Sequence, residues 1–379
     1  MDVSAVRHGL TNGVAVYTAN LARALLRLST PELVAWYCAR RTAAAEAVLE
    51  ELASLGARVA RCPAPWRWSP DGAWWLPWAP PFAAVLDGVD VFHIGEFQLP
   101  RSGPAAPPFV ATVHDLTTLT HPAHHTLLNR VVHRRRLRWI RRHAARVIAV
   151  SDSTGRDLGT RAGIGAGRVT VVHEARGHAL PTPDDPDAVL RRYDVGRPYV
   201  LAVGTLEPRK NHVRLVHAFE GLDRHAPELV LVGARGWRSR HIAKAIEASP
   251  ARERIRVLGP VPAADLAALY ARATVFAYPS LYEGFGLPVL EAMAAGVPVL
   301  TSDRSSLPEV AGDAAVLVDP GSIESIRAGL ARLLAEPGLR ERLGAAGAAR
   351  ERTFTWERTA RETLEAYHEA AGGRTGPTP

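Results

Sequence analysis

The chain of 379 residues alternates apolar runs of strand length with amphipathic stretches of helix length, and it does so in two successive series. This alternation predicts parallel α/β units, because a parallel strand returns to its sheet through a crossover helix. Between the two series lies 181–187, Pro-Thr-Pro-Asp-Asp-Pro-Asp, whose prolines favour a break. The fold class is therefore α/β, with two Rossmann-like domains that face each other across a cleft and bind ligands at the carboxyl ends of their strands.

The pattern predicts a domain at 1–180, a linker at 181–196, a second domain at 197–354, and a terminal helix and tail at 355–379 that can return to the first domain. In the first domain we expect strands at 33–37, 89–93, 110–114, 147–150 and 169–173, with helices at 17–28, 44–55 and about 127–145. In the second domain we expect strands at 199–203, 229–232, 255–258, 275–278, 297–301 and 315–318, with helices between them.

Cysteine content and hydropathy argue against a disulfide-stabilised protein and against a membrane-spanning one. Cys38 and Cys62 are the two cysteines, too few for a disulfide framework or a four-thiolate metal site, so we expect a reducing, cytoplasmic compartment. The uncharged run 72–86 contains three prolines and is too short to span a bilayer.

The positive charge is concentrated in one segment. The whole chain carries a formal charge of +8, and residues 116–151 contain eight arginines and no acidic residue. The rest of the chain is therefore neutral in sum. Any electrostatic attraction to a partner is expected to act through this segment.

A first candidate site is the loop 204–211, Gly-Thr-Leu-Glu-Pro-Arg-Lys-Asn, which follows an expected strand and precedes a helix. Gly204 allows close approach of a ligand to the backbone, and the neighbouring cations Arg209 and Lys210 suit a diphosphate. The alternative is a solvated basic turn. Lysine occurs only twice in a chain with 44 arginines, which favours a retained function for Lys210.

A second candidate site is the segment 279–298, where a glycine-rich loop leads into a helix. Free backbone N–H groups near Gly286 and Leu287 can bind an anion or a sugar. Glu283 on the loop and Glu291 on the helix can contact different parts of one extended ligand. The alternative for Glu291 is a surface position on the helix.

Together these two segments closely resemble glycosyltransferase family 4, whose members are retaining, nucleotide-sugar-dependent enzymes with the GT-B fold. Glu283-x7-Glu291 resembles the paired-glutamate motif of that family, and 204–211 resembles its phosphate loop. The resemblance extends to 112–116, 147–151 and 354–358, and it is strongest in the second half of the chain.

The resemblance implies a role for each matched residue. It assigns Arg209 and Lys210 to the donor diphosphate and Glu291 to the ribose hydroxyls. The remaining implied contacts with the donor involve Glu283, Phe285, Gly286 and Leu287 at the sugar, His114 facing the sugar from the first domain, Gly204 in the phosphate loop, and Gly13 beside the phosphates.

The resemblance also implies a front-face substitution in which the departing phosphate takes the proton of the acceptor. GDP-mannose is the first expected donor and UDP-glucose the second, with the base read by the backbone of 259–262. No cofactor is expected beyond the donor, which is a substrate, and no metal, because Asp185 and Asp187 look like a solvated turn. We expect His121, His124 and His125 to be loop residues.

The expected acceptor is a glycan, a lipid-linked glycan or a small molecule. Five tryptophans within 66–78 and the arginines within 130–146 suit peripheral contact with an anionic membrane, at its inner face; a packed loop and a solvated helix face are the alternative. A GT-B-fold sugar epimerase or phosphorylase is the alternative enzyme. Nucleic-acid binding, suggested by the pI of about 10.0, leaves both candidate sites unexplained, so we expect no nucleic-acid partner.

Overall fold

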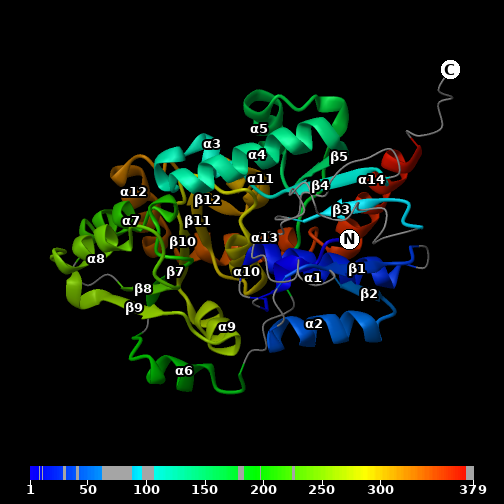
Figure 1. The fold of residues 1–379 in the computed structure, drawn as a ribbon. Coiled ribbons are helices and arrows are strands. Elements are labelled where there is room, and N and C mark those ends of the chain that lie inside the picture. The colour runs from blue at the N-terminus through cyan, green and yellow to red at the C-terminus, as the bar shows by residue number, and fades with distance from the viewer. Residues whose placement is uncertain are drawn as a thin grey trace. The chain divides into compact units, whose positions relative to one another are not determined.

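The structure is a computed structural model. It describes residues 1–7, 9–10, 12–28, 31–39, 42–61, 88–95, 106–177, 183–196, 198–223 and 227–372. The chain forms two compact units (Figure 1). Unit 1 contains Met1–Gly177 together with Thr355–Pro379, and unit 2 contains His178–Phe354.

The described part of unit 2 contains one sheet of six parallel strands in the order β12-β11-β10-β7-β8-β9. The strands are β7 (Tyr199–Val203), β8 (Glu228–Val232), β9 (Ile255–Gly259), β10 (Val275–Tyr278), β11 (Val299–Ser302) and β12 (Ala315–Val318). The central strands β7 and β10 are buried almost throughout. Apolar runs such as these are typical of parallel strands with both faces covered.

Helices connect these strands and supply the other half of the core. They are α6 (Pro186–Arg192), α7 (His212–Glu220), α8 (Ser239–Glu247), α9 (Ala263–Arg272), α10 (Leu287–Ala294), α11 (Leu307–Ala311), α12 (Ile323–Ala335) and α13 (Pro337–Glu351). One cluster of buried side chains joins the sheet to α7, α8, α12 and α13. This packing fixes the strand ends from which the candidate loops start.

Unit 1 contains a four-stranded parallel sheet in the order β3-β4-β5-β6 and a parallel pair β1-β2 within the described ranges. The strands are β1 (Val34–Tyr37), β2 (Arg58–Arg61), β3 (Phe92–Ile94), β4 (Phe109–Val113), β5 (Ala144–Ala149) and β6 (Val169–Val171). The first residues of the chain join the two sheets: the Trp36 amide donates to the Met1 carbonyl at 2.8 Å, and the Asp2 amide donates to the His93 carbonyl at 2.9 Å.

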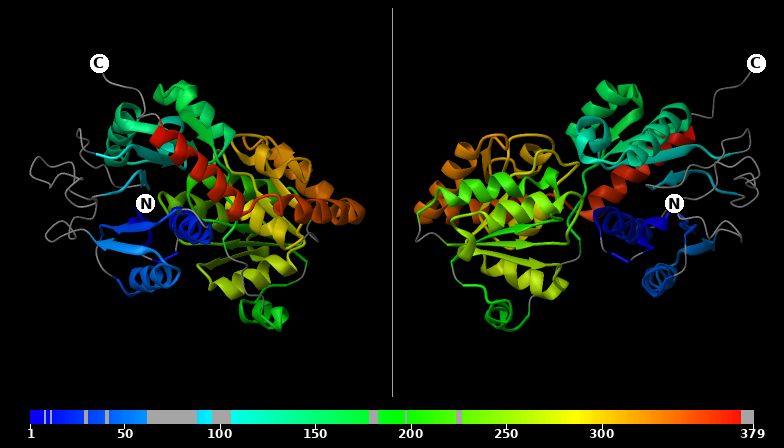
Figure 2. Two further views of the ribbon diagram at one scale, coloured as in Figure 1. Left: turned by 90° about the vertical axis from the view of Figure 1, so that its right-hand side faces the viewer. Right: turned by 60° about the vertical axis from the view of Figure 1, so that its left-hand side comes forward.

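The helices of unit 1 are α1 (Gly13–Arg27), α2 (Ala43–Ser54), α3 (Thr117–Thr120), α4 (Leu127–His143), α5 (Asp152–Ala162) and α14 (Trp356–Gly372). Helix α14, red in Figure 2, packs in the cores of unit 1 through Ala360 and Ala366. The Trp356 indole also donates to the Arg176 carbonyl at 2.7 Å. The end of the chain therefore belongs to the unit in which it began.

The structure confirms the α/β class and the parallel strands. Some bounds are shifted, as in β3, which spans Phe92–Ile94 where 89–93 was expected, and two segments differ in kind. Strand β2 was not expected, because its side chains are half-exposed and it lacks an apolar run. The expected linker contains α6, which packs on α9 within unit 2. Asp185 caps that helix by accepting from the Ala188 amide at 3.0 Å, and Asp187 pairs with Arg272 at 3.0 Å. Pro186 and Asp185 therefore begin a helix, and Asp187 fastens that helix to α9.

Cys38 is buried. Cys62 and the tryptophan-rich segment 66–78 lie outside the described residues. No helix in the part of the chain that the structure describes is long and apolar enough to span a bilayer.

Candidate functional site

Two loops of unit 2 meet at the carboxyl ends of the adjacent strands β7 and β10. The first is 204–211, and the second is 279–286. The Leu281 amide of the second loop donates to the Arg209 carbonyl of the first at 2.9 Å. The two segments that the sequence singled out are therefore one structural unit.

The backbone of Gly204 lies against the aliphatic part of the Lys210 side chain. Its φ of +147° is a conformation that side chains with a Cβ rarely adopt. A Cβ placed here would lie 3.5 Å from the Cε atom of Lys210. The absence of a side chain leaves the end of β7 open to the aliphatic part of Lys210.

Asn211 ties the first loop to the second. Its φ is +63°, and its buried Nδ2 donates to the carbonyls of Pro279 at 2.9 Å and Pro320 at 2.7 Å. Helix α7 starts at the next residue. The turn that carries Arg209 and Lys210 is a 3-10 helix over Pro208–Lys210. Asn211 fixes the end of this turn.

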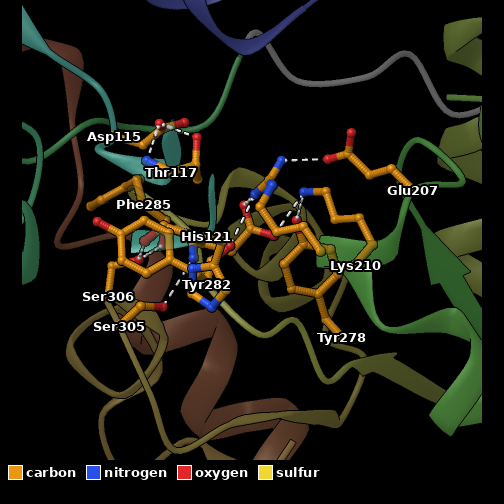
Figure 3. A network of polar contacts seen from close by, with 12 residues as sticks. Asp115, Thr117, His121, Glu207, Lys210, Tyr278, Tyr282, Phe285, Ser305 and Ser306 are labelled. Atoms are coloured by element: carbon orange, nitrogen blue, oxygen red, sulfur yellow. Dashed lines mark hydrogen bonds and ion pairs between the residues drawn. The ribbon is translucent and has the colours of Figure 1, made fainter. Parts of the chain in front are cut away.

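The carboxylate of Glu283 bridges the two cations. Its Oε2 accepts from Nη1 of Arg209 at 2.6 Å, and its Oε1 accepts from Nζ of Lys210 at 2.8 Å. The ammonium group also donates to the Tyr278 hydroxyl, and Glu207 accepts from Nη2 of Arg209 at 2.7 Å. Figure 3 shows Glu207, Lys210 and Tyr278 in this network.

The electrostatics of this cluster follow from its burial. Burial raises the pKa of Glu283, but the charges of Arg209 and Lys210 and the hydrogen bond from Lys210 outweigh that effect and lower this pKa to about 2. Burial lowers the pKa of Lys210, with Glu283 opposing the shift. Burial and the nearby Glu283 charge raise the pKa of Tyr278 well above its usual value. The acid is therefore ionised at neutral pH and the phenol is protonated.

Two serines hold the loop that carries Glu283. The Glu283 amide donates to Oγ of Ser305 at 3.0 Å, and the Ser306 hydroxyl lies 3.1 Å from the Glu283 carbonyl and 2.6 Å from the Phe285 carbonyl. Ser306 is fully buried. These contacts fix the backbone on both sides of the carboxylate, as Figure 3 shows for the labelled Ser305 and Ser306.

The cluster can present cations to an anion at little reorganisation cost. Two positive groups are balanced by Glu207 and Glu283, so the site is paired before any ligand arrives. Arginine carries five N–H donors in a fixed fork and lysine carries three, and both groups are suited to phosphate oxygens. Preplaced donors of this kind suit a reaction that develops negative charge on a phosphate.

The residues after Glu283 build the start of α10. Phe285 is buried and packs edge-on against Phe354, with ring centroids 5.7 Å apart. Gly286 has a φ of +122°, and a Cβ there would approach the Leu307 side chain to 2.8 Å. Leu287 is the first residue of α10.

Glu291 lies on α10, about one helical turn after Leu287, and Tyr270 holds its carboxylate. The Tyr270 hydroxyl donates to Oε2 of Glu291 at 2.9 Å, and burial together with the Glu291 charge raises the pKa of this phenol. The carboxylate is thus oriented by α9, the helix that follows the expected base-reading segment 259–262. It is a directed acceptor and not an unconstrained surface acid.

The other expected residues belong to unit 1. Gly13 is exposed and opens α1, whose N-cap Asn12 accepts from the Ala15 amide at 3.0 Å. His114 directly follows β4, and its Nδ1 lies 2.8 Å from Oε1 of Glu174. Unit 2 therefore brings together Gly204, Arg209, Lys210 and Glu283, whereas in unit 1 Gly13 begins a helix and His114 follows a strand.

Several residues of these sites carried no signal that sequence reasoning could use. Tyr278 is the last residue of an apolar strand, and Ser305 and Ser306 lie on a segment without a motif. Tyr270 and Glu174 likewise come from stretches with no distinctive spacing. The histidines at 121, 124 and 125 belong to unit 1, where a 3-10 helix over Pro122–His124 interrupts the expected loop. The His121 ring stacks on the His124 ring with centroids 5.6 Å apart.

Comparison with known proteins gives two family matches. The family described as "Glycosyl transferases group 1" matches residues 191–350, and the family described as "Glycosyltransferase Family 4" matches residues 11–175. Each match falls almost wholly within one structural unit. Together they cover both candidate sites. The match over 11–175 contains Gly13 and His114, and the match over 191–350 contains Glu283 and Glu291.

Individual relatives agree with these families. The chain is 36% identical over 290 residues to O-antigen chain mannosyltransferase B of Escherichia coli, covering 73% of this chain and 74% of that one. It is 28% identical over 230 residues to the serotype-specific mannosyltransferase WbdA of Escherichia coli, covering 58% of this chain and 28% of that longer one. The crystal structure of Anabaena Alr3699/HepE in complex with UDP and glucose matches with a TM-score of 0.73 at 18% identity, covering 95% of this chain and 97% of that one. This structural match confirms the GT-B fold.

Proposed function

Since this chain belongs to the glycosyltransferases of family 4 and is a nucleotide-sugar-dependent hexosyltransferase, we propose that it transfers mannose from GDP-mannose, with retention at the anomeric carbon, to a glycan or lipid-linked acceptor. The two Escherichia coli relatives named above are mannosyltransferases, which supports mannose over glucose. The O-antigen relative supports a glycan destined for the cell envelope.

One observation carries this proposal: the Glu283 carboxylate holds Arg209 and Lys210 side by side at the ends of β7 and β10. In the transfer, the bond between the anomeric carbon and the diphosphate oxygen breaks, and negative charge develops on that oxygen. Arg209 and Lys210 stabilise this charge. One such preplaced donor is typically worth about 10²–10³ in rate.

The acceptor hydroxyl attacks from the face that the diphosphate leaves, so the configuration is retained. Its oxygen forms the new bond to the anomeric carbon, and its proton goes to the departing phosphate oxygen. This route needs no separate general base. It also needs no resident metal or cofactor, because the two side-chain cations supply the positive charge at the diphosphate.

The remaining residues bind the parts of the donor. Glu291, oriented by Tyr270, accepts from the ribose hydroxyls. The backbone from Phe285 to Leu287 contacts the mannosyl group at the start of α10. In unit 1, the family resemblance assigns His114 to a sugar hydroxyl and Gly13 to the diphosphate.

A donor panel tests this function. Thermal shift with GDP, UDP, GDP-mannose and UDP-glucose should give its largest increase in Tm with the guanine nucleotides. Product formed from α-linked GDP-mannose should show the α-anomeric coupling by NMR. Stabilisation by none of the nucleotides, or an inverted product, would overturn the proposal. Release of epimer or sugar phosphate without an acceptor would favour the epimerase or phosphorylase alternative.

Helix α4 supports the finer proposal that the enzyme attaches to the inner face of an anionic membrane. Its first two turns expose Leu127, Leu128, Val131 and Val132 by 74%, 71%, 49% and 50%. By helical spacing, exposed arginines continue this face in the later turns: Arg134, Arg135, Arg138, Arg141 and Arg142. An apolar end followed by cations suits lipid tails and phosphate headgroups.

The structure removes two arginines from the expected basic surface. Arg136 donates to the carbonyls of Gly95 and Thr112 at 2.9 and 3.2 Å, so it secures α4 to the sheet. Arg146 lies on β5 and pairs with Glu369 of α14 at 3.2 Å. The proposed membrane face is therefore the outer side of α4 alone.

A further inference from the structure

A buried carboxylate faces His114 in unit 1. His114 follows β4, and Glu174 follows β6, two strands that flank β5 in the same parallel sheet. Their carboxyl ends lie at one edge, where Nδ1 of His114 is 2.8 Å from Oε1 of Glu174. The side chains are only 15% and 6% exposed. The pair is thus shielded from water that would compete for this hydrogen bond.

The chemistry of the two groups sets the position of one proton. An ionised carboxylate has acceptors only, so the ring nitrogen at 2.8 Å must carry the hydrogen. A neutral imidazole that is protonated at Nδ1 presents a lone pair at Nε2. His114 in this state is a hydrogen-bond acceptor toward a ligand hydroxyl, with its opposite nitrogen fixed to the protein.

The orientation of the ring is fixed from a second side. The Tyr17 ring packs edge-on against the His114 ring, with centroids 4.7 Å apart and an interplanar angle of 85°. Tyr17 is itself held, because its hydroxyl lies 3.1 Å from Oγ1 of Thr112, which lies 2.7 Å from Nε2 of the buried His93. Rotation of the imidazole would break the Glu174 bond and disturb this packing.

We infer that Glu174 is a positioning residue that holds His114 in the Nδ1–H form, so that Nε2 accepts a hydrogen bond from a substrate hydroxyl. This inference rests on the proposed function, in which His114 binds a sugar hydroxyl. Glu174 acts through the imidazole and does not itself contact the sugar.

Three variants test whether Glu174 fixes the tautomer of His114. Glu174→Gln keeps an oxygen that can accept from Nδ1–H, whereas Glu174→Ala removes it, and His114→Asn identifies the His114 signal by its loss. We expect ¹⁵N NMR of histidine-labelled protein to show the Nδ1–H tautomer in the wild type and in Glu174→Gln. In Glu174→Ala the signal should move toward the Nε2–H tautomer that predominates in water.

The kinetic readout should follow the tautomer. Turnover at saturating donor should fall about 10- to 100-fold in Glu174→Ala, by analogy with removal of the partner that orients a metal-ligating imidazole, and by only a few-fold in Glu174→Gln. A purely structural role would lower Tm without moving the tautomer. An unchanged tautomer in folded Glu174→Ala, or wild-type turnover in that variant when His114→Asn is impaired, would overturn the inference.

Two further outcomes keep the inference separate from the proposed function. If Glu174→Ala does not fold, Glu174→Asp, which is one methylene shorter and still charged, takes its place, and a wild-type tautomer and rate in that variant would overturn the inference. If the tautomer responds as expected but His114→Asn leaves transfer unchanged, the proposed contact between His114 and the sugar fails instead.

Discussion

Arg209 holds Glu283 at two points: its Nη1 lies 2.6 Å from the carboxylate and 3.0 Å from the carbonyl of the preceding Tyr282. One guanidinium thus fixes both the acid and the backbone that carries it. Lys210 completes the bridge from the other carboxylate oxygen.

Lys210→Ala should lower kcat/KM more than it lowers stability. The variant loses a charge-assisted contact with the donor diphosphate of about 1.5–3 kcal/mol, or roughly 10- to 150-fold in kcat/KM. Steady-state kinetics with the donor measures the loss. Lys244→Ala is the matched control, because Lys244 is the other lysine of the chain and lies exposed on α8. Equal kinetics in both variants would contradict the assignment of Lys210.

Glu283→Gln should remove a pH-dependent part of the stability. The pKa of Glu283 is about 2 in the fold against 4.5 in the unfolded chain, so the folded state binds fewer protons. Its contribution, about 3 kcal/mol from this difference, is present above pH 4.5 and is lost as the pH falls toward 2.

Urea unfolding at several pH values checks the Glu283 prediction. The wild type should be more stable than Glu283→Gln at pH 6, and the gap should narrow as the pH falls below 4.5. Glu341→Gln, at an exposed position on α13, should match the wild type throughout. A gap that does not change with pH would mean that Glu283 is not held ionised by its two cations.

Glu291→Ala should weaken donor binding while leaving turnover at saturation close to the wild-type value. The ribose hydroxyls lose a charged acceptor worth about 1.5–3 kcal/mol, so the Kd for GDP should rise roughly 10- to 150-fold. Tyr270→Phe should give a smaller rise, because it removes only the donor that orients the carboxylate. Calorimetry with GDP decides the point; an unchanged Kd in Glu291→Ala would leave this acid without a role in the donor site.

The double variant Leu127→Ser, Leu128→Ser should reduce pelleting with anionic liposomes at least tenfold, since each buried leucine contributes about 1.5–3 kcal/mol. Replacing Arg138 and Arg142 by Gln should weaken binding mainly at low salt, by about 1 kcal/mol per arginine. Leu317→Ser, at a residue 40% exposed on β12 of unit 2, is the control. Binding of the wild type to neutral and anionic vesicles alike, or to neither at low salt, would speak for a small soluble acceptor.

Much of the fold was predictable, because buried parallel strands have apolar runs that the sequence displays directly. The expected strand at 199–203 has the observed bounds of β7. Strand β2 escaped because its arginines and half-exposed side chains do not form such a run. The segment expected to be a linker contains α6, since Pro186 after an N-cap aspartate starts a helix as readily as it interrupts one.

The candidate site was predictable only where one motif carried its residues. Arg209 and Lys210 follow one expected strand and Glu283 follows another, so both loops were expected at the carboxyl ends of a parallel sheet. Their pairing through one carboxylate was not. Tyr278 and Ser305 reach the cluster through tertiary packing, which has no short-range pattern in the sequence.

The membership of α14 in unit 1 has a consequence for biosynthesis. The apolar cluster around α1 includes Ala360, with Trp356 and Tyr367 packed against it. A nascent chain in which all residues up to Phe354 have left the ribosome can complete unit 2, but unit 1 still lacks part of its interior. The second unit can therefore mature first, contrary to the usual N-terminal-first order. A fragment ending at Gly177 would expose the surface that α14 covers, and it would need residues 355–372 supplied in trans to become stable.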